Sequence, residues 1–256
     1  IGFGYRLVGR ERKELGSDCA ADILNRLSEA HLKLSEGQGA ELLWRDAAEK
    51  SLSPLDALKI YALKTAPAFE AALYAGLRLA GPAEPYEKAV AEFSKNLGVA
   101  FQVLNDLKDW EGDTDNKLVA GQDVLAARPT LLLALALEGS SPAERQELLA
   151  LIDQCQKMSA SLGKSGRTPE AIHAETSLLV GKVRGFFQKA QVFDKAEKLI
   201  EKFRARAEAV ADEVEPTELR ELLYFLVDTV LDRQTPPEPE EPPLMQLTLA
   251  SPLAAR

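Results

Sequence analysis

The sequence contains little cysteine and little histidine: two residues of each in a chain of 256. Two cysteines, Cys19 and Cys155, cannot build the disulfide framework of a small secreted domain, and they are typical of a reducing compartment. We therefore expect a cytoplasmic protein. The small number of histidines, His31 and His173 alone, argues against a zinc site.

Long hydrophobic runs and an excess of positive charge are also missing. The longest uninterrupted apolar run covers residues 131–137 and is far too short to cross a bilayer. There are 31 Lys and Arg residues against 40 Asp and Glu residues, a net charge of −9. Proteins that bind nucleic acid gain affinity from lysines and arginines that neutralise phosphates. We therefore expect no transmembrane segment and no nucleic-acid partner.

The sequence does contain the composition of a globular domain and a proline-rich end. Hydrophobic residues make up 46% and charged residues 28% of the chain, which is close to the globular norm. Six of the fourteen prolines fall between Pro236 and Pro252. Proline removes backbone donors and fixes φ, so this end is unsuited to a packed core. We expect one domain over residues 1–233 and a Pro-rich tail over 234–256.

Helix signals dominate the first 233 residues. Serine before Pro54 predicts a capped helix start, Gly81 a helix end, and Pro142 and Pro169 two further starts. Apolar residues recur at helical spacing, most clearly over residues 219–231, and no segment alternates in the manner of a strand. The fold class is therefore predicted to be all-α, with about nine helices. One of them is expected to run without interruption from Pro54 to the end of the apolar stretch at Gly81.

An acidic helix over residues 101–113 carries the densest chemistry. On an ideal helix one face collects Gln102, Asn105, Asp106, Asp109 and Asp113, while the opposite face is apolar. Like charges one turn apart repel each other, and a divalent cation would remove that repulsion. Oxygen ligands suit Mg²⁺, which takes one or two carboxylates together with substrate phosphates. A solvated acidic face explains the same pattern, and the residues alone support the two interpretations equally.

Two lysines add the cations that a phosphate would need. Lys64, followed by Thr65, lies in the middle of an otherwise apolar helix, and Lys117 follows the acidic helix. A buried ammonium without a partner is costly, although a single lysine often reaches solvent by extending its side chain. Two lysines together with the acidic helix favour a diphosphate–metal site over coincidence.

The order of these segments resembles the trans-isoprenyl diphosphate synthase (polyprenyl synthetase) family. That family carries GQ-x-x-D-L, K-T, FQ-x-x-DDxxD, GK-x-x-G-x-D and GK-x-TLP segments. The matching residues are Gly37-Gln38 with Glu41-Leu42, then Lys64-Thr65, then Phe101-Gln102 with Asn105, Asp106 and Asp109, then Lys117 with Gly121 and Asp123, and last Thr130-Leu131.

The resemblance implies an all-α bundle around a central cavity, Mg²⁺ as cofactor and a homodimer. It also implies that an allylic diphosphate condenses with isopentenyl diphosphate through an allylic carbocation. Residue by residue, it leads us to assign metal binding to Asn105, Asp106, Asp109 and, by spacing, Asp113. Substrate binding is assigned to Gln38, Lys64, Thr65, Phe101, Gln102 and Lys117, of which Lys64, Gln102 and Lys117 are expected to be catalytic.

Departures from the family pattern keep alternatives open. Asn105 stands where the second aspartate-rich motif begins with aspartate, and Glu41 replaces another aspartate. The spacing of Asn105, Asp109 and Asp113 is also similar to the metal triad of class I terpene cyclases, so a cyclase or lyase is an alternative.

The first DDxxD motif of the family is absent from the sequence, which begins Ile-Gly-Phe-Gly without methionine. From the motif order we expect the chain to enter the family pattern at the helix after that motif. The absence also makes a non-catalytic helical subunit that dimerises with an active synthase a further alternative.

Overall fold

The computed structural model describes residues 2–111, 120–161 and 169–232. Within these ranges the chain forms α-helices and one 3-10 helix and no strand, which confirms the all-α prediction. The elements are α1 (Gly2–Arg10), α2 (Arg12–Leu15), α3 (Ser17–Asp46), α4 (Pro54–Lys64), α5 (Ala66–Ala80), η1 (Glu84–Tyr86), α6 (Glu87–Glu111), α7 (Gln122–Leu125), α8 (Leu131–Glu138), α9 (Pro142–Ser161), α10 (Pro169–Lys189), α11 (Val192–Asp212) and α12 (Thr217–Val230).

Helix starts lie where the sequence signals place them. The Ser53 side chain accepts a hydrogen bond from Asp56 N, and the Asp56 carboxylate accepts one from Ser53 N, which makes a capping box before Pro54. Helices α9 and α10 start at Pro142 and Pro169, and α5 ends at Ala80, directly before Gly81. These predicted boundaries are confirmed.

The helix expected to be continuous from Pro54 is broken in two. Helix α4 ends at Lys64, Thr65 adopts φ −126° and ψ −49°, and α5 starts at Ala66. Pro67 has no N–H to donate to the carbonyl one turn earlier, and its ring crowds that carbonyl, so the helix cannot pass through this point. This break, with the short helices α1, α2 and α7, raises the number of helices in the described residues above the predicted nine.

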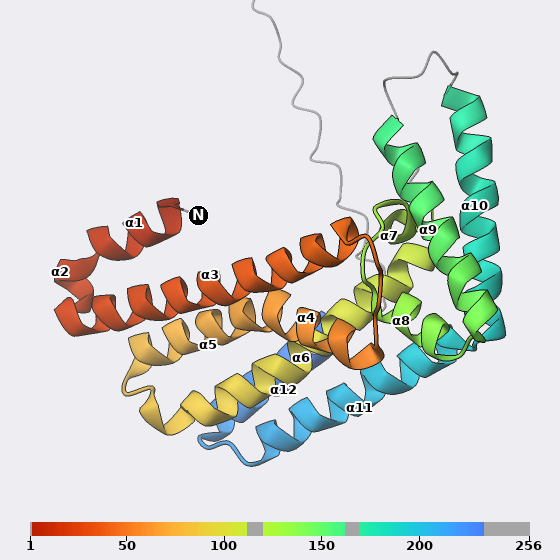
Figure 1. The fold of residues 1–256 in the computed structure, drawn as a ribbon. Helices are drawn as coiled ribbons and strands as arrows, with labels where there is room; N and C mark the ends of the chain where they lie inside the picture. The colour runs from red at the N-terminus through yellow and green to blue at the C-terminus, as the bar shows by residue number, and fades with distance from the viewer. Residues whose placement is uncertain (1, 112–119, 162–168, 233–256) are drawn as a thin grey trace, which may run out of the picture.

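The core lies where α6 passes through the middle of the bundle. In Figure 1, α3 and α5 run antiparallel on one side of α6, and α11 and α12 cover another side, while α9 and α10 form a hairpin at one end. Helix α6 packs most extensively against α11. All residues from Leu131 to Leu137 on α8 are buried, so the longest apolar run of the sequence is core.

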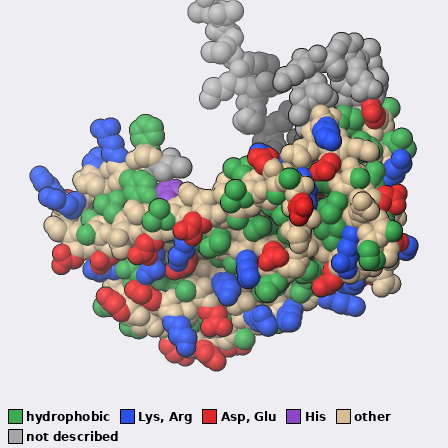
Figure 2. All heavy atoms as spheres, viewed as in Figure 1, with side chains coloured by type: hydrophobic (Ala, Val, Ile, Leu, Met, Phe, Trp, Pro, Cys, Tyr) green, Lys and Arg blue, Asp and Glu red, His purple; other side chains and the backbone are tan. Residues whose placement is uncertain are grey.

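The surface carries charges of both signs. Figure 2 shows lysines and arginines interspersed with aspartates and glutamates, with hydrophobic side chains between them. No described helix combines the length and the apolar character that a membrane crossing requires. The predicted tail, 234–256, and its boundary at residue 233 lie outside the described residues and stay a prediction.

Candidate diphosphate-binding site

The break between α4 and α5 is enclosed by two glycines. A Cβ atom on Gly37 of α3 would lie 2.7 Å from the backbone nitrogen of Lys64, and one on Gly98 of α6 would lie 2.8 Å from the Cα of Ala66. Only residues without a side chain allow α3 and α6 to approach the broken backbone this closely. The two helices therefore hold Lys64 in a fixed position between them.

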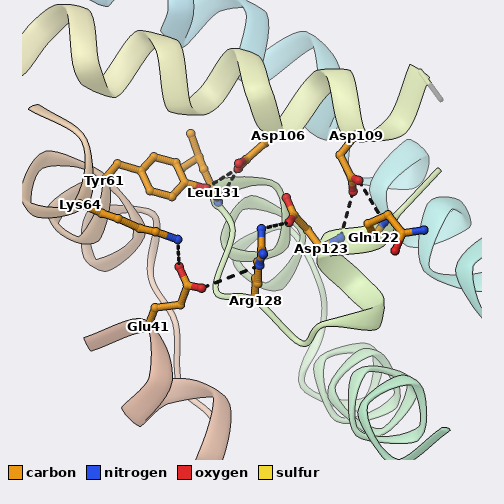
Figure 3. Close-up of polar contacts among 9 residues, drawn as sticks. All are labelled: Glu41, Tyr61, Lys64, Asp106, Asp109, Gln122, Asp123, Arg128 and Leu131. Atoms are coloured by element: carbon orange, nitrogen blue, oxygen red, sulfur yellow. Dashed lines mark hydrogen bonds and ion pairs between the residues drawn. The ribbon is translucent and has the colours of Figure 1, made fainter. Parts of the chain in front are cut away.

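A cluster of alternating charges surrounds the end of α4. Lys64 forms an ion pair with Glu41 of α3. Arg128, from the segment between α7 and α8, donates from Nη1 to Oδ1 of Asp123 at 2.8 Å, and its Nε lies 3.8 Å from Oε1 of Glu41. Figure 3 shows Glu41 between the two cations and Arg128 between the two carboxylates. We call Glu41, Lys64, Asp123 and Arg128 the charge cluster.

Asp109, near the end of α6, lies next to this cluster. Its Oδ1 accepts a hydrogen bond from Gln122 N at 3.0 Å and its Oδ2 accepts one from Asp123 N at 3.1 Å. Burial raises the pKa of Asp109, and the negative charge of Asp123 raises it further. Burial likewise raises the pKa of Asp123, against the lowering effect of Arg128. Carboxylates from two helices, α6 and α7, are thus placed near each other. The repulsion predicted from the sequence was between Asp109 and Asp113, and Asp113 lies outside the described residues.

Asp106, three residues before Asp109, has a different environment. Its side chain is buried, with 1% of the residue exposed, and it accepts hydrogen bonds from the Tyr61 hydroxyl and, at 3.3 Å, from Leu131 N. Leu131 N also donates to the Tyr61 oxygen, at 2.6 Å. Burial raises the pKa of Asp106 to about 8, although the Tyr61 hydrogen bond lowers it. We call Tyr61, Asp106 and Leu131 the buried triad, which joins α4, α6 and α8.

Two further contacts extend from the break along α5 and α6. The Thr65 hydroxyl donates to Oε1 of Gln102 at 3.1 Å. One turn further along α5, Phe69 packs edge-on against Phe101, with ring centroids 6.0 Å apart. The polar contact at the break is thus followed, one helical turn along α5, by an aromatic contact.

The Polyprenyl synthetase family profile matches residues 5–165, more than half of the chain. The chain belongs to the polyprenyl synthetase family.

The alignments with curated relatives cover about half of each relative's length or less. The octaprenyl diphosphate synthase of Escherichia coli is 31% identical over 154 residues, which cover 59% of this chain and 46% of that enzyme. The geranylfarnesyl diphosphate synthase of Aeropyrum pernix is 32% identical over 130 residues, or 49% of this chain and 38% of that enzyme. The chain therefore spans about half the length of the curated relatives that it matches.

Solved structures show the same fold. The geranylgeranyl pyrophosphate synthetase of Pyrococcus horikoshii has a TM-score of 0.67 at 20% identity, covering 85% of this chain and 60% of that one. A polyprenyl synthase of Caulobacter crescentus, complexed with calcium and isoprenyl diphosphate, has a TM-score of 0.61 at 25% identity, covering 84% and 60%. The helical bundle is thus the isoprenyl synthase fold predicted from the sequence.

The structure brings together only part of the predicted site. Lys64, Thr65 and Gln102 lie at the helix break, with Phe101 beside them. Asp109 lies beside the charge cluster, with half-buried Asn105 one turn before it on α6. Gln38 is exposed on α3, and no described residue hydrogen-bonds to its side chain. Asp113 and Lys117 lie outside the described residues, and the metal assignment as a whole stays a prediction.

Sequence reasoning missed Arg128 and Tyr61. Arg128 had a signal: it stands two residues before Thr130, where the family segment GK-x-TLP has its lysine. Tyr61 had no signal except its place on an apolar helix face. Its partner Asp106 is distant in the sequence, and the contact depends on how α4 and α6 pack.

Proposed function

We propose that this chain provides the diphosphate-binding part of a prenyltransferase that condenses an allylic diphosphate with isopentenyl diphosphate. The supporting observation is that Lys64 and Arg128, from segments far apart in the sequence, converge on Glu41 at positions that match family motifs. Because the chain spans about half of its relatives, the complete activity is part of the proposal.

The chain's own residues suit the departure of a diphosphate. When the allylic C–O bond breaks, negative charge grows on the leaving oxygen, and Lys64 and Arg128 stabilise it. Thr65 and Gln102 supply hydrogen-bonding groups beside these cations, and the predicted Lys117 would add a third charge. The double bond of isopentenyl diphosphate then attacks the allylic cation, and a proton is lost.

Mg²⁺ is part of this proposal. Within the ranges that the structure describes, no group of three or more His, Cys, Asp or Glu side chains could hold a metal ion. Mg²⁺, however, is usually bound by one or two carboxylates together with substrate phosphates. Asp109 and Asp123 provide such a pair, with Asn105 and the predicted Asp113 as further oxygen ligands. Bound there, the ion would supply positive charge to the leaving diphosphate.

Asp106 is omitted from the proposed metal ligands, because only 1% of the residue is exposed and its carboxyl is hydrogen-bonded inside the core to Tyr61 and Leu131. This differs from the assignment made on the sequence, where Asp106 lay in the same arc of the acidic helix. The proposed metal ligands are thus restricted to side chains outside the buried triad.

One face of α5, beginning at the break, carries apolar residues that suit a prenyl chain. Phe69, Leu73, Gly76 and Ala80 follow Thr65 at helical spacing along α5. The last three line a pocket of about 590 Å³ between α5 and the start of α12, with apolar side chains predominating. Apolar walls keep water away from a carbocation, so the prenyl chain in our proposal extends along α5.

We also propose that the protein acts as a homodimer, as the family resemblance implies, and in the cytoplasm, as its low cysteine content suggests. Exposed apolar side chains on α1 and α3, among them Phe3, Leu32 and Leu43, are consistent with a covered surface. Light scattering coupled to size exclusion should give twice the chain mass, and a monomer at micromolar concentration would contradict this part.

Diphosphate release tests the catalytic proposal. The protein incubated with Mg²⁺, an allylic diphosphate and isopentenyl diphosphate should release diphosphate. Lys64→Ala and Asp109→Ala should each lower the rate about 100-fold, because each removes a group that acts on the leaving diphosphate or its metal. Lys59→Ala and Glu111→Ala, which change exposed residues of the same helices, serve as matched controls. Rates that are unchanged in Lys64→Ala and Asp109→Ala would contradict the site.

The same assay separates the alternatives. A cyclase or lyase with the Asn105, Asp109 and Asp113 triad would release diphosphate from the allylic substrate alone. A non-catalytic subunit would release none by itself and would change the products of an active synthase when mixed with it. Release that requires both substrates supports the prenyltransferase.

A further inference from the structure

Glu41 holds the two cations that the proposed function assigns to the substrate. Its carboxylate forms an ion pair with Lys64 and lies 3.8 Å from the Arg128 guanidinium. Only 12% of the Glu41 side chain is exposed, against 25% for Lys64 and 51% for Arg128. The carboxylate is therefore the most enclosed of these three side chains, while the cations retain access to solvent. Figure 3 shows Glu41 between Lys64 and Arg128.

The charges around Lys64 do not favour an anion while Glu41 stays in place. Glu41 and Asp123 balance Lys64 and Arg128, and Asp109 lies beside them. A diphosphate approaching this site meets cations whose hydrogen-bond donors already contact carboxylates. It must displace Glu41 from Lys64 or share the ammonium with it, and the repulsion between the two anions opposes both arrangements.

We propose that Glu41 is a built-in counter-ion that occupies the diphosphate position of Lys64 and Arg128 in the ligand-free protein and competes with diphosphate for them. This inference rests on the proposed function, since it takes the same two cations as the diphosphate site. It assigns to Glu41 a role in setting anion affinity. An ion pair that served stability alone would lower affinity when broken, because Lys64 would lose the partner that positions it.

Titration calorimetry with inorganic pyrophosphate tests the competition directly. EDTA and fixed ionic strength keep divalent cations and salt from contributing. Glu41→Gln keeps the length of the side chain and removes its charge, so it should bind pyrophosphate about five-fold more tightly than the wild type. In a Lys64→Ala background the same substitution should give a smaller gain, because Arg128 alone remains to be released.

A second acidic residue provides the matched control. Glu36 is exposed on the same helix, five residues before Glu41, and Glu36→Gln removes the same charge from the protein. It should leave the affinity unchanged. If Glu36→Gln tightens binding as much as Glu41→Gln does, the effect comes from net charge and the inference is overturned.

The remaining outcomes separate this inference from the proposed function. Equal or weaker binding by Glu41→Gln, with binding by the wild type intact, overturns the counter-ion role and leaves the diphosphate site standing. No binding by the folded wild type or the folded variant overturns the diphosphate site and the counter-ion role together. If Glu41→Gln does not fold, Glu41→Asp decides instead: its shorter carboxylate should release Lys64 in part and tighten binding by a smaller factor, and unchanged affinity overturns the inference.

Discussion

Asp106 and Asp109 lie one turn apart on α6 but belong to two different regions of the molecule. Asp106 is in the buried triad, where Tyr61 and Leu131 N donate to it and 1% of the residue is exposed. Asp109 is half-buried, bonded to backbone N–H groups of α7, and lies beside the charge cluster. The first carboxyl joins three helices, whereas the second faces groups that could bind a ligand.

This difference shows that an acidic motif is not one functional unit. A rotation of about 60° around the helix axis is enough to move a carboxylate from the ligand-facing side into the core. The buried triad should therefore control stability, and the charge cluster should control binding. Each prediction below tests this division.

Asp106→Ala should have the largest effect on stability. It leaves the buried Tyr61 hydroxyl without its acceptor and removes the longer of the two hydrogen bonds of Leu131 N–H, which should cost about 3 kcal/mol in the free energy of unfolding. Asp109→Ala, in a more exposed position, should cost about 1 kcal/mol or less. Urea denaturation of the two variants measures both values, and equal losses would contradict the division.

The stability of the protein should depend on pH through the Asp106 carboxyl. Because burial raises the pKa of Asp106 to about 8, the folded state retains its proton where the unfolded chain has released it. The stability that protonated Asp106 adds to the folded state is fully present below about pH 4, the pKa of an unfolded aspartate. This stability is lost as the pH rises through about 8. Urea denaturation between pH 5.5 and 9 should show this decline in the wild type and a flatter profile in Asp106→Asn. Identical profiles would mean that Asp106 ionises normally.

Gly98→Ala should lower stability by less than Asp106→Ala does, and it should also weaken binding at the charge cluster. Its Cβ would lie 2.8 Å from the Cα of Ala66, so α5 or α6 must shift, at a cost of about 2 kcal/mol. The shift should also displace Lys64 and weaken pyrophosphate binding. Gly76→Ala is the matched control, since no atom lies within 4 Å of its Cβ position and alanine favours the helix. A thermal melt in which Gly98→Ala matches Gly76→Ala would contradict the close packing.

Local signals in the sequence were sufficient for most of the fold. Ser53, Gly81, Pro142 and Pro169 mark helix ends by their own backbone chemistry, and the structure has helix ends there. The break at Thr65 carried a signal too, Pro67, but the surrounding apolar periodicity suggested one continuous helix.

The site was less predictable, because its contacts join distant segments. Helical spacing placed Asp106 and Asp109 on one face, but it does not determine which edge of that face is buried. That depends on Tyr61 and α8, which pack against α6 only in the tertiary structure. The pairing of Arg128 with Glu41 likewise depends on the approach of α3 to the segment after α7.

The central claim is that Lys64, held at the helix break, binds diphosphate. Titration of the wild type, Lys64→Ala and Lys59→Ala with inorganic pyrophosphate tests it most directly, because Lys59 is an exposed lysine on the same helix. Lys64→Ala should bind at least about ten-fold more weakly, as expected for the loss of a charge-assisted contact, and Lys59→Ala should bind as the wild type does. Equal affinities for all three proteins would contradict the claim.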